Sequence, residues 1–135
     1  MPSSVYEVIA EMPRKESFAT EGDMIRGVVR GFNRMIILWL LESRSLSGYE
    51  ILKETRKLTG QHLHSGVVYP QLYELERAHL VRSRWKSKGR RRINYYSLTG
   101  KGRGFIEHTR KTLTKPMRET LRRLLGGAKA RTNVK

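Results

Sequence analysis

The densest group of chemically active side chains in the sequence is a basic run between positions 82 and 92. It holds seven bases and no acid: Arg82, Arg84, Lys86, Lys88, Arg90, Arg91 and Arg92. Ammonium and guanidinium groups bind phosphate oxygens, and a solvated loop does not need so many of them. The run therefore predicts a surface that lies along phosphates or a minor groove, with contacts from Lys86, Lys88, Arg90, Arg91 and Arg92.

A second group lies just before this run, in the stretch 65–81, which reads SGVVYPQLYELERAHLV. Its apolar residues recur mostly at helical spacing, so one side of a helix would face a core and the other would face a partner. Ser65 is expected to cap this helix, and Pro70 is tolerated only near its first turn. The candidates for contact with a DNA groove are Ser65, Gly66, Val67, Tyr69, Gln71 and Tyr73.

Two of these candidates have an ordinary alternative. Tyr69 also fits an aromatic side chain packed in the core. Gln71 has the chemistry to read adenine, but its spacing fits a solvent-facing position equally well. Taken alone, the whole stretch fits an ordinary core helix, so its interpretation depends on the surrounding elements.

The composition favours a polyanionic partner. Lys and Arg total 28 against 12 Asp and Glu, for a formal net charge of +16, which is far more than solubility requires. Residues 1–24 hold five acids and two bases, so the remainder carries +19. At 135 residues the chain can bury one modest core, which argues for a single domain with extensions.

Several kinds of chemistry find no support in the sequence. The chain has no cysteine, and its four histidines are scattered along it, so we expect no metal and no cofactor. No acid–base pair, nucleophile elbow or phosphate-binding glycine loop is present, so we do not expect an enzyme. The longest apolar run, 35–41, is too short for a membrane span, and the N-terminus does not resemble a signal peptide. We expect a cytoplasmic protein that associates with the nucleoid when it binds DNA.

The basic run and the groove candidates must be positioned by neighbouring elements. A first helix is predicted over 25–42, most deeply buried near Trp39, and Leu46 adds a short strand. A second helix follows over 48–58 and ends at Gly60.

After the third helix, residues 81–86 and 93–98 alternate like two strands of a hairpin. Gly89 supplies the chemistry for the turn between them. Two helices at an angle followed by a basic hairpin are typical of a helix-turn-helix with a wing.

A last helix is expected after the hairpin, capped by Thr99. Pro116 should kink or restart this helix, with Thr114 as the new cap. A stripe at four-residue steps lines the helix: Phe105, Thr109, Leu113, Met117, Leu121 and Leu125. Part of this stripe would be exposed in a monomer, so we expect a homodimer that buries it.

The order of these elements, together with several short motifs, resembles the PadR family of winged-helix transcriptional regulators over residues 25–104. The motifs are Arg26-Gly27, Gly48-Tyr49-Glu50-Ile51, Gly66 with Tyr69-Pro70, Leu72, Leu75-Glu76, Leu80-Val81, and Tyr95-Tyr96-Ser97-Leu98-Thr99 with Gly102. Their order and spacing carry the resemblance, rather than any single motif.

The chain departs from the family pattern at four positions. The family commonly has His at Ser47, Pro at Ser65, Thr or Ser at Val67, and Gly at His79. At Val67 an apolar surface that could meet a thymine methyl group replaces a hydroxyl. His79 must take a helix-ending conformation that Gly adopts more easily.

The resemblance implies a mainly α fold with a small β-hairpin (α+β), that is, a winged helix-turn-helix with a long C-terminal dimerisation helix. We expect residues 1–24 to form an N-terminal arm, partly disordered, and 25–99 the DNA-binding domain. Residues 100–125 would form the dimerisation helix and 126–135 a disordered basic tail. The expected function is sequence-specific binding of double-stranded DNA by a homodimer that regulates transcription, as a repressor.

Whether a small-molecule effector exists stays open, and Trp85 fits either an effector cavity at the dimer interface or the packing of the wing.

Two other functions fit part of the pattern. An architectural protein that coats DNA with weak sequence selectivity fits the large charge and the apolar Val67. An RNA-binding protein of the translation apparatus fits the charge, but the sequence lacks a stacking platform of exposed aromatic residues.

Overall fold

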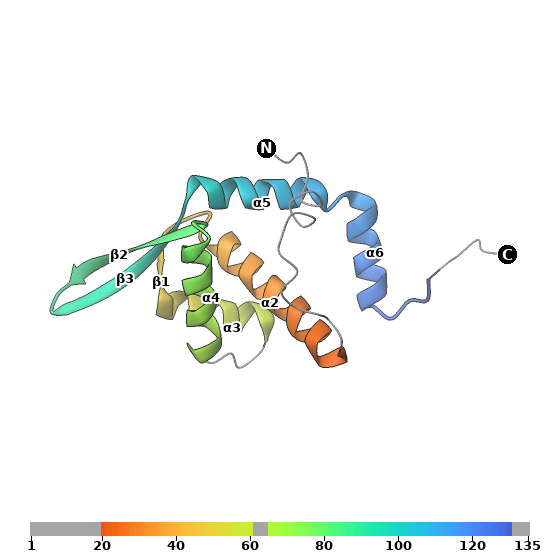
Figure 1. The fold of residues 1–135 in the computed structure, drawn as a ribbon, viewed down its shortest axis with the longest axis horizontal. Coiled ribbons are helices and arrows are strands. Elements are labelled where there is room, and N and C mark those ends of the chain that lie inside the picture. The colour runs from red at the N-terminus through yellow and green to blue at the C-terminus, as the bar shows by residue number, and fades with distance from the viewer. Residues whose placement is uncertain (1–19, 61–64, 131–135) are drawn as a thin grey trace. The chain divides into compact units, whose positions relative to one another are not determined.

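The computed structural model describes residues 20–60 and 65–130. In these ranges the elements are α2 (Glu21–Leu40), β1 (Leu46–Ser47), α3 (Gly48–Thr59), α4 (Ser65–Arg77), β2 (Val81–Lys88), β3 (Arg91–Leu98), α5 (Gly100–Thr112) and α6 (Lys115–Leu125) (Figure 1). The chain divides into two compact units, whose described parts are residues 20–60 with 65–106, and residues 107–130. The predicted fold class, helices with a small antiparallel sheet, is confirmed.

The first helix, α2, begins at Glu21, four residues before the predicted start, because the side chain of Thr20 accepts a hydrogen bond of 3.1 Å from the backbone N–H of Asp23. Its last turns bury Ile37 and Leu38. The prediction that Trp39 lies in the core is wrong, since its side chain is 52% exposed. At about 100° per residue, Trp39 points roughly opposite to Ile37, so the face that turns inward excludes it.

Helix α3 has both ends that the sequence predicts. Ser47 and Glu50 form a reciprocal capping box, with the Ser47 side chain bonded to the Glu50 N–H and the Glu50 carboxylate bonded to the Ser47 N–H, each at 3.1 Å. Gly60 ends the helix in the left-handed region at φ 65°, where a glycine has no steric penalty.

The sheet has three antiparallel strands in the order β1-β3-β2. Leu46 lies opposite Tyr96, which confirms the short strand predicted at Leu46. Strands β2 and β3 pair along their full length, from Val81 opposite Leu98 to Lys88 opposite Arg91. Each strand is two residues longer toward the turn than predicted, because Gly89, at φ 65°, closes the hairpin with only two residues.

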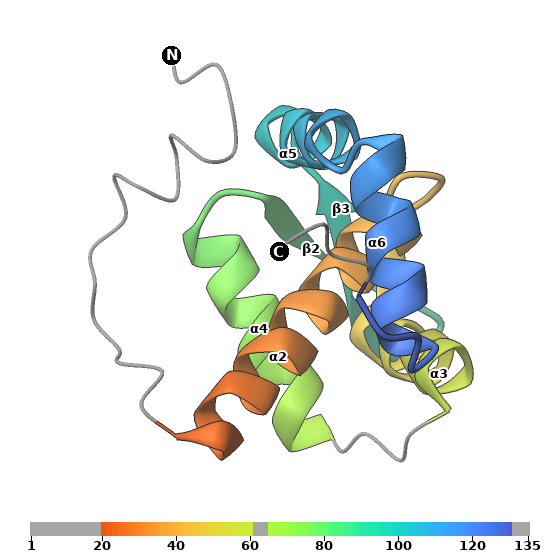
Figure 2. The same ribbon diagram turned by 90° about the vertical axis from the view of Figure 1, so that its right-hand side faces the viewer.

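The core of the larger unit lies where the C-terminal part of α2 meets α3, α4 and the base of the hairpin. Its buried side chains are Ile37, Leu38, Leu41, Leu46, Ile51, Leu52, Val68, Leu72, Leu75, Val81, Leu98 and Ile106. Figure 2 shows α2, α3 and α4 as neighbouring helices. The hairpin leaves this core and extends past α3 and α4 (Figure 1), so the basic residues near its turn are carried away from the apolar interior.

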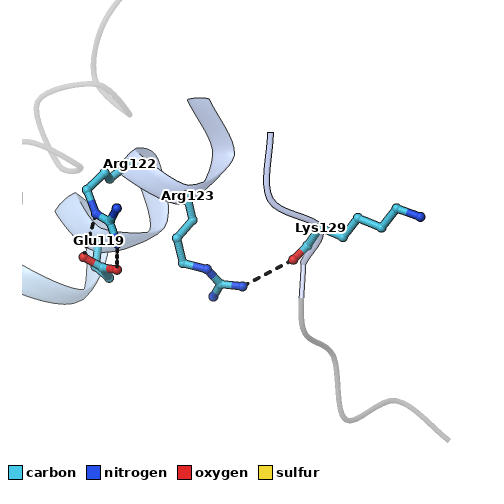
Figure 3. A network of polar contacts seen from close by, with 4 residues as sticks. All are labelled: Glu119, Arg122, Arg123 and Lys129. Carbon is cyan, nitrogen blue, oxygen red and sulfur yellow. Dashed lines mark hydrogen bonds and ion pairs between the residues drawn. The ribbon is translucent and has the colours of Figure 1, made fainter. Parts of the chain in front are cut away.

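The predicted C-terminal helix is two helices, α5 and α6, because the chain restarts as predicted at Thr114 with Pro116 in the first turn. Thr99 caps α5 by accepting a 3.0 Å hydrogen bond from the Gly102 N–H. In α6 no residue is buried, and Leu121, Leu124 and Leu125 are 52%, 65% and 74% exposed. The opposite side of α6 is polar, with Arg122 paired to Glu119 at 2.5 Å and Arg123 donating to the Lys129 carbonyl at 3.3 Å (Figure 3).

Candidate nucleic-acid interface

One edge of α4 is exposed along the length of the helix. Gly66, Val67, Pro70, Tyr73 and Arg77 are exposed, and Tyr73 reaches 60%. Steps of three and four residues place them on one side, while Val68, Leu72 and Leu75 on the other side enter the core. We name this set the α4 edge. It contains three of the residues predicted to contact a groove.

Pro70 stands deeper in the helix than expected, at its sixth residue rather than in the first turn. A proline there leaves the carbonyl four residues earlier, on Gly66, without its helical donor. Gly66 is exposed, so water or a partner can bind that carbonyl. This is why the proline is tolerated at low cost.

Gln71 does not reach the surface, contrary to its prediction as a groove or solvent-facing residue. It is only 7% exposed, and its Oε1 has no hydrogen-bond partner among the described residues. Around the helix it lies next to Leu75 and Val68, which are both buried, because one residue further along rotates the side chain by about 100° from Pro70. In this conformation Gln71 cannot contact a base.

Tyr69 divides its side chain between packing and exposure. A Cβ built on Gly48 would lie 2.5 Å from Cε1 of Tyr69, so the ring packs directly on the glycine that begins α3. The side chain is still 42% exposed. Tyr69 therefore holds α3 and α4 together and also borders the α4 edge, which combines the two alternatives from the sequence.

A polar cluster fastens the hairpin to α4. The Ser83 hydroxyl on β2 donates a 2.6 Å hydrogen bond to the Glu76 carboxylate on α4. The neighbouring Tyr96 is partly buried, and burial raises the pKa of its phenol, with smaller contributions from Glu76 and Tyr69. Tyr96 is thus kept neutral beside a carboxylate.

The C-terminal end of α4 is held by the segment that follows the hairpin. His79 adopts φ 61°, the left-handed conformation that the sequence requires of it. The Thr99 hydroxyl donates to the His79 carbonyl at 2.6 Å, and Lys101 Nζ donates to the Ala78 carbonyl at 3.0 Å. These bonds satisfy helix-end carbonyls that would otherwise need water.

The basic residues of the hairpin are divided between its two faces. Opposite residues of an antiparallel pair share a face and successive residues alternate, so the register places five bases on one face: Arg82, Arg84, Lys86, Lys88 and Arg91. We name this set the basic face. Arg92 projects from the other face, together with Ser83 and Trp85, and Arg90 lies in the turn. All five predicted contacts are exposed: Lys86, Lys88, Arg90, Arg91 and Arg92.

Two kinds of residue were missed when the site was selected from sequence. Arg77 lies four residues after Tyr73 and its guanidinium stands 5.8 Å from the centre of that ring. Tyr49 and Lys53 on α3 form a similar pair at 5.7 Å, with Tyr49 64% exposed. The four-residue spacing of an aromatic residue and a base on one helix is the signal that could have identified both pairs.

Two other features, a metal-binding cluster and a membrane-spanning helix, are not found among the described residues. Among residues 20–60 and 65–130, no group of three His, Asp or Glu side chains could hold a metal ion. In the same part of the chain, no helix is both long and apolar enough to cross a membrane.

Comparison with known proteins gives a consistent result. The family model described as "Transcriptional regulator PadR-like family" matches residues 37–108. A PadR family transcription regulator from Clostridium difficile is 28% identical, with a TM-score of 0.62, over 71% of this chain and 100% of that one. A PadR-like transcriptional regulator from Bacillus cereus is 22% identical, with a TM-score of 0.64, over 73% and 96% of the two chains, and supports the fold. No curated protein sequence matches significantly.

A further solved structure is that of Bacillus subtilis PadR in complex with operator DNA. It is 27% identical, with a TM-score of 0.50, over 55% of this chain and 44% of that protein.

Proposed function

Because the chain belongs to the PadR-like family of transcriptional regulators, we propose that it binds a specific operator in double-stranded DNA as a homodimer and acts as a repressor. The observation that carries the proposal is the bond between Ser83 and Glu76, which joins the helix that carries the α4 edge to the basic hairpin. One duplex can then meet both surfaces.

In this proposal α4 enters the major groove. A helix of about 10–12 Å diameter fits a groove about 12 Å wide. The residues that approach the bases are those of the α4 edge, with Gly66 allowing close approach and Val67 offering an apolar contact for a thymine methyl group. Tyr69 and Tyr73 border this contact, and Ser65 contributes the backbone N–H at the helix start, where a phosphate binds favourably.

The hairpin supplies affinity that does not depend on sequence. The hairpin is a single pair of strands, and its basic face carries Arg82, Arg84, Lys86, Lys88 and Arg91. Such long side chains can reach the phosphates that border a groove. Each phosphate contact releases counterions, so binding through this face should weaken strongly as salt rises.

The exposed apolar side of α6 supports dimerisation. Leu121, Leu124 and Leu125 are more than half exposed, and burial of such side chains contributes about 1.5–3 kcal/mol each. A two-fold dimer would present two α4 helices to half-sites about 34–36 Å apart, or a multiple. The operator complex of the related Bacillus subtilis protein supports the assignment of operator DNA as the partner.

The remaining expectations about the chain are part of the same proposal. Residues 25–99 form the DNA-binding domain and 100–125 the dimerisation segment. The N-terminal arm expected over 1–24 and the basic tail expected over 126–135 fall mostly outside the described residues, and the described residues 21–24 form the first turn of α2. Repression would follow from occupation of a promoter in the cytoplasmic nucleoid.

The test begins with selection of genomic fragments by the full chain. Affinity for the best fragment is then compared with that for a random duplex of equal length at one fixed salt concentration. A preference of about 1,000-fold or more is expected for a specific regulator. Nearly equal affinities would instead favour an architectural DNA-coating protein, for which the net charge of +16 is the supporting observation.

A further inference from the structure

Trp85 is a large apolar side chain placed where the fold does not need it. It lies on β2 opposite Asn94, on the same face as Ser83 and two residues nearer the turn. Ser83 is the point at which this face contacts α4, and beyond that point Trp85 is 60% exposed. This exposure argues against packing of Trp85 within the wing, whereas an effector cavity at a dimer interface stays an alternative.

Arg92 accompanies the indole on this face. It lies diagonally across the hairpin from Trp85, and its guanidinium carbon is 5.6 Å from the ring centre. An aromatic ring at this distance attracts a guanidinium and restricts its orientation. Among the basic residues of the hairpin, Arg92 is thus the one whose side chain is paired with Trp85.

We propose that Trp85 packs against the sugar edge of duplex DNA and holds Arg92 in position to enter the minor groove beside the site of α4. This inference rests on the proposed DNA-binding function and adds a specificity-determining pair to it. The pair would favour operators whose minor groove is narrow at this point, as in A·T-rich tracts, where the negative potential is enhanced.

The choice of partner follows from charge and size. The hairpin 81–98 carries seven basic residues and no acidic one, which complements a polyanion. The minor groove of B-DNA is about 6 Å wide, too narrow for a two-stranded ribbon but wide enough for one guanidinium. An indole beside it offers its flat apolar surface to deoxyribose and its N–H to a phosphate.

The two faces of the hairpin then have different roles. The Lys and Arg side chains of the basic face contact phosphates, so their contribution to affinity does not depend on the DNA sequence. Arg92 on the opposite face, which is also the face toward α4 through Ser83, reads groove width. Substitutions on the two faces should therefore change different properties of binding.

The first experiment uses Trp85 as its own reporter. The chain contains two tryptophans, so Trp39→Phe leaves Trp85 as the single indole, and the change is mild because Trp39 is 52% exposed. Tryptophan emission is recorded while the selected operator duplex is added, and binding is followed in parallel by the anisotropy of labelled DNA. We expect a blue shift and quenching that saturate together with the anisotropy.

The outcomes are distinct. Full binding with unchanged Trp85 emission would overturn the contact while leaving the proposed function intact. Absence of binding to any duplex would overturn both, and it is detected by anisotropy without reference to the tryptophan.

The second experiment measures selectivity. Arg92→Lys keeps the charge but loses the planar group, so we expect the preference for an A·T-rich over a G·C-rich flank at the hairpin to fall by about threefold or more. Arg84→Lys, on the basic face, is the matched control and should keep that preference. Equal selectivity in the two variants would contradict the assignment of Arg92.

Discussion

The hydroxyl of Ser83 lies 2.6 Å from the carboxylate of Glu76, so one hydrogen bond joins the hairpin to the helix that carries the α4 edge. The bond is partly buried and its acceptor is charged. Such a bond fixes the orientation of two elements that are both proposed to meet the same duplex.

Ser83→Ala should test this bond. We expect a loss of about 0.5–1.5 kcal/mol in the free energy of unfolding, together with weaker binding to the operator because the hairpin is no longer aligned. Urea unfolding and DNA anisotropy measure the two effects. Ser87→Ala is the control, since Ser87 lies on the same face of β2 and is exposed; if it weakened binding equally, the alignment role of Ser83 would be wrong.

Gly48→Ala should destabilise the domain, because its Cβ would lie 2.5 Å from the Tyr69 ring. We expect a loss of about 1–3 kcal/mol, partly recovered in the double variant Gly48→Ala with Tyr69→Leu. Thermal unfolding of the three proteins measures this.

Gly66→Ala provides the contrasting case. Nothing lies within 4 Å of a Cβ built on Gly66, and alanine favours a helix by about 1 kcal/mol over glycine. We therefore expect unchanged or increased stability with reduced operator affinity, because the added methyl group separates the helix from the DNA. Unchanged affinity would remove Gly66 from the interface.

The capping box predicts a pH dependence. The Ser47 N–H, bonded to the carboxylate, holds the pKa of Glu50 below its ordinary value of 4.5 despite partial burial, and the charges of Arg44 and Lys88 add to this. Because the pKa is lower in the folded state, the stabilisation is complete above the ordinary value and is lost as pH falls through the folded value. The difference in unfolding free energy between the wild type and Glu50→Gln should shrink between about pH 5 and pH 3; a difference that is constant over this range would exclude the carboxylate as its source.

The basic face should determine the salt dependence. Lys88→Ala and Arg91→Ala should each reduce the slope of log affinity against log salt by about 1, on operator and random DNA alike. Arg26→Ala is the control, because Arg26 is on α2 and paired with Asp23 at 2.6 Å. A slope that changes only on the operator would mean that these residues read bases instead.

Leu121→Glu should dissociate the proposed dimer. The side chain is 52% exposed in the single chain, so the fold should persist while sedimentation shows a monomer. Operator affinity should fall about 100-fold, because two linked half-sites become independent. Lys115→Glu, at an exposed position on the opposite side of α6, should leave the dimer intact.

Local sequence signals predicted several helix ends and the hairpin turn. Thr99 and Thr114 stand at helix starts, and Gly60 and Gly89 at a helix end and a turn, because capping and left-handed conformations depend on one or two residues. His79 shows the same, as its position required a left-handed backbone whatever its side chain.

The direction of individual side chains was harder to predict. Trp39 was expected in the core and is exposed, whereas Gln71 was expected at the surface and is buried. One residue along a helix rotates the side chain by about 100°, which decides whether it enters the core or leaves it. The pairing of Trp85 with Arg92 depends on the register of two strands, which no local pattern contains.

The order of the sheet, β1-β3-β2, leaves β2 as an edge strand among the described residues. Its outer N–H and C=O groups could pair with the same edge of another molecule and begin aggregation. Arg82, Arg84, Lys86 and Lys88 alternate along that strand, and their mutual repulsion keeps two such edges apart. Neutralising all four would therefore be expected to make the protein insoluble at low salt before it unfolds, so the charges proposed to hold DNA also keep the free protein from polymerising.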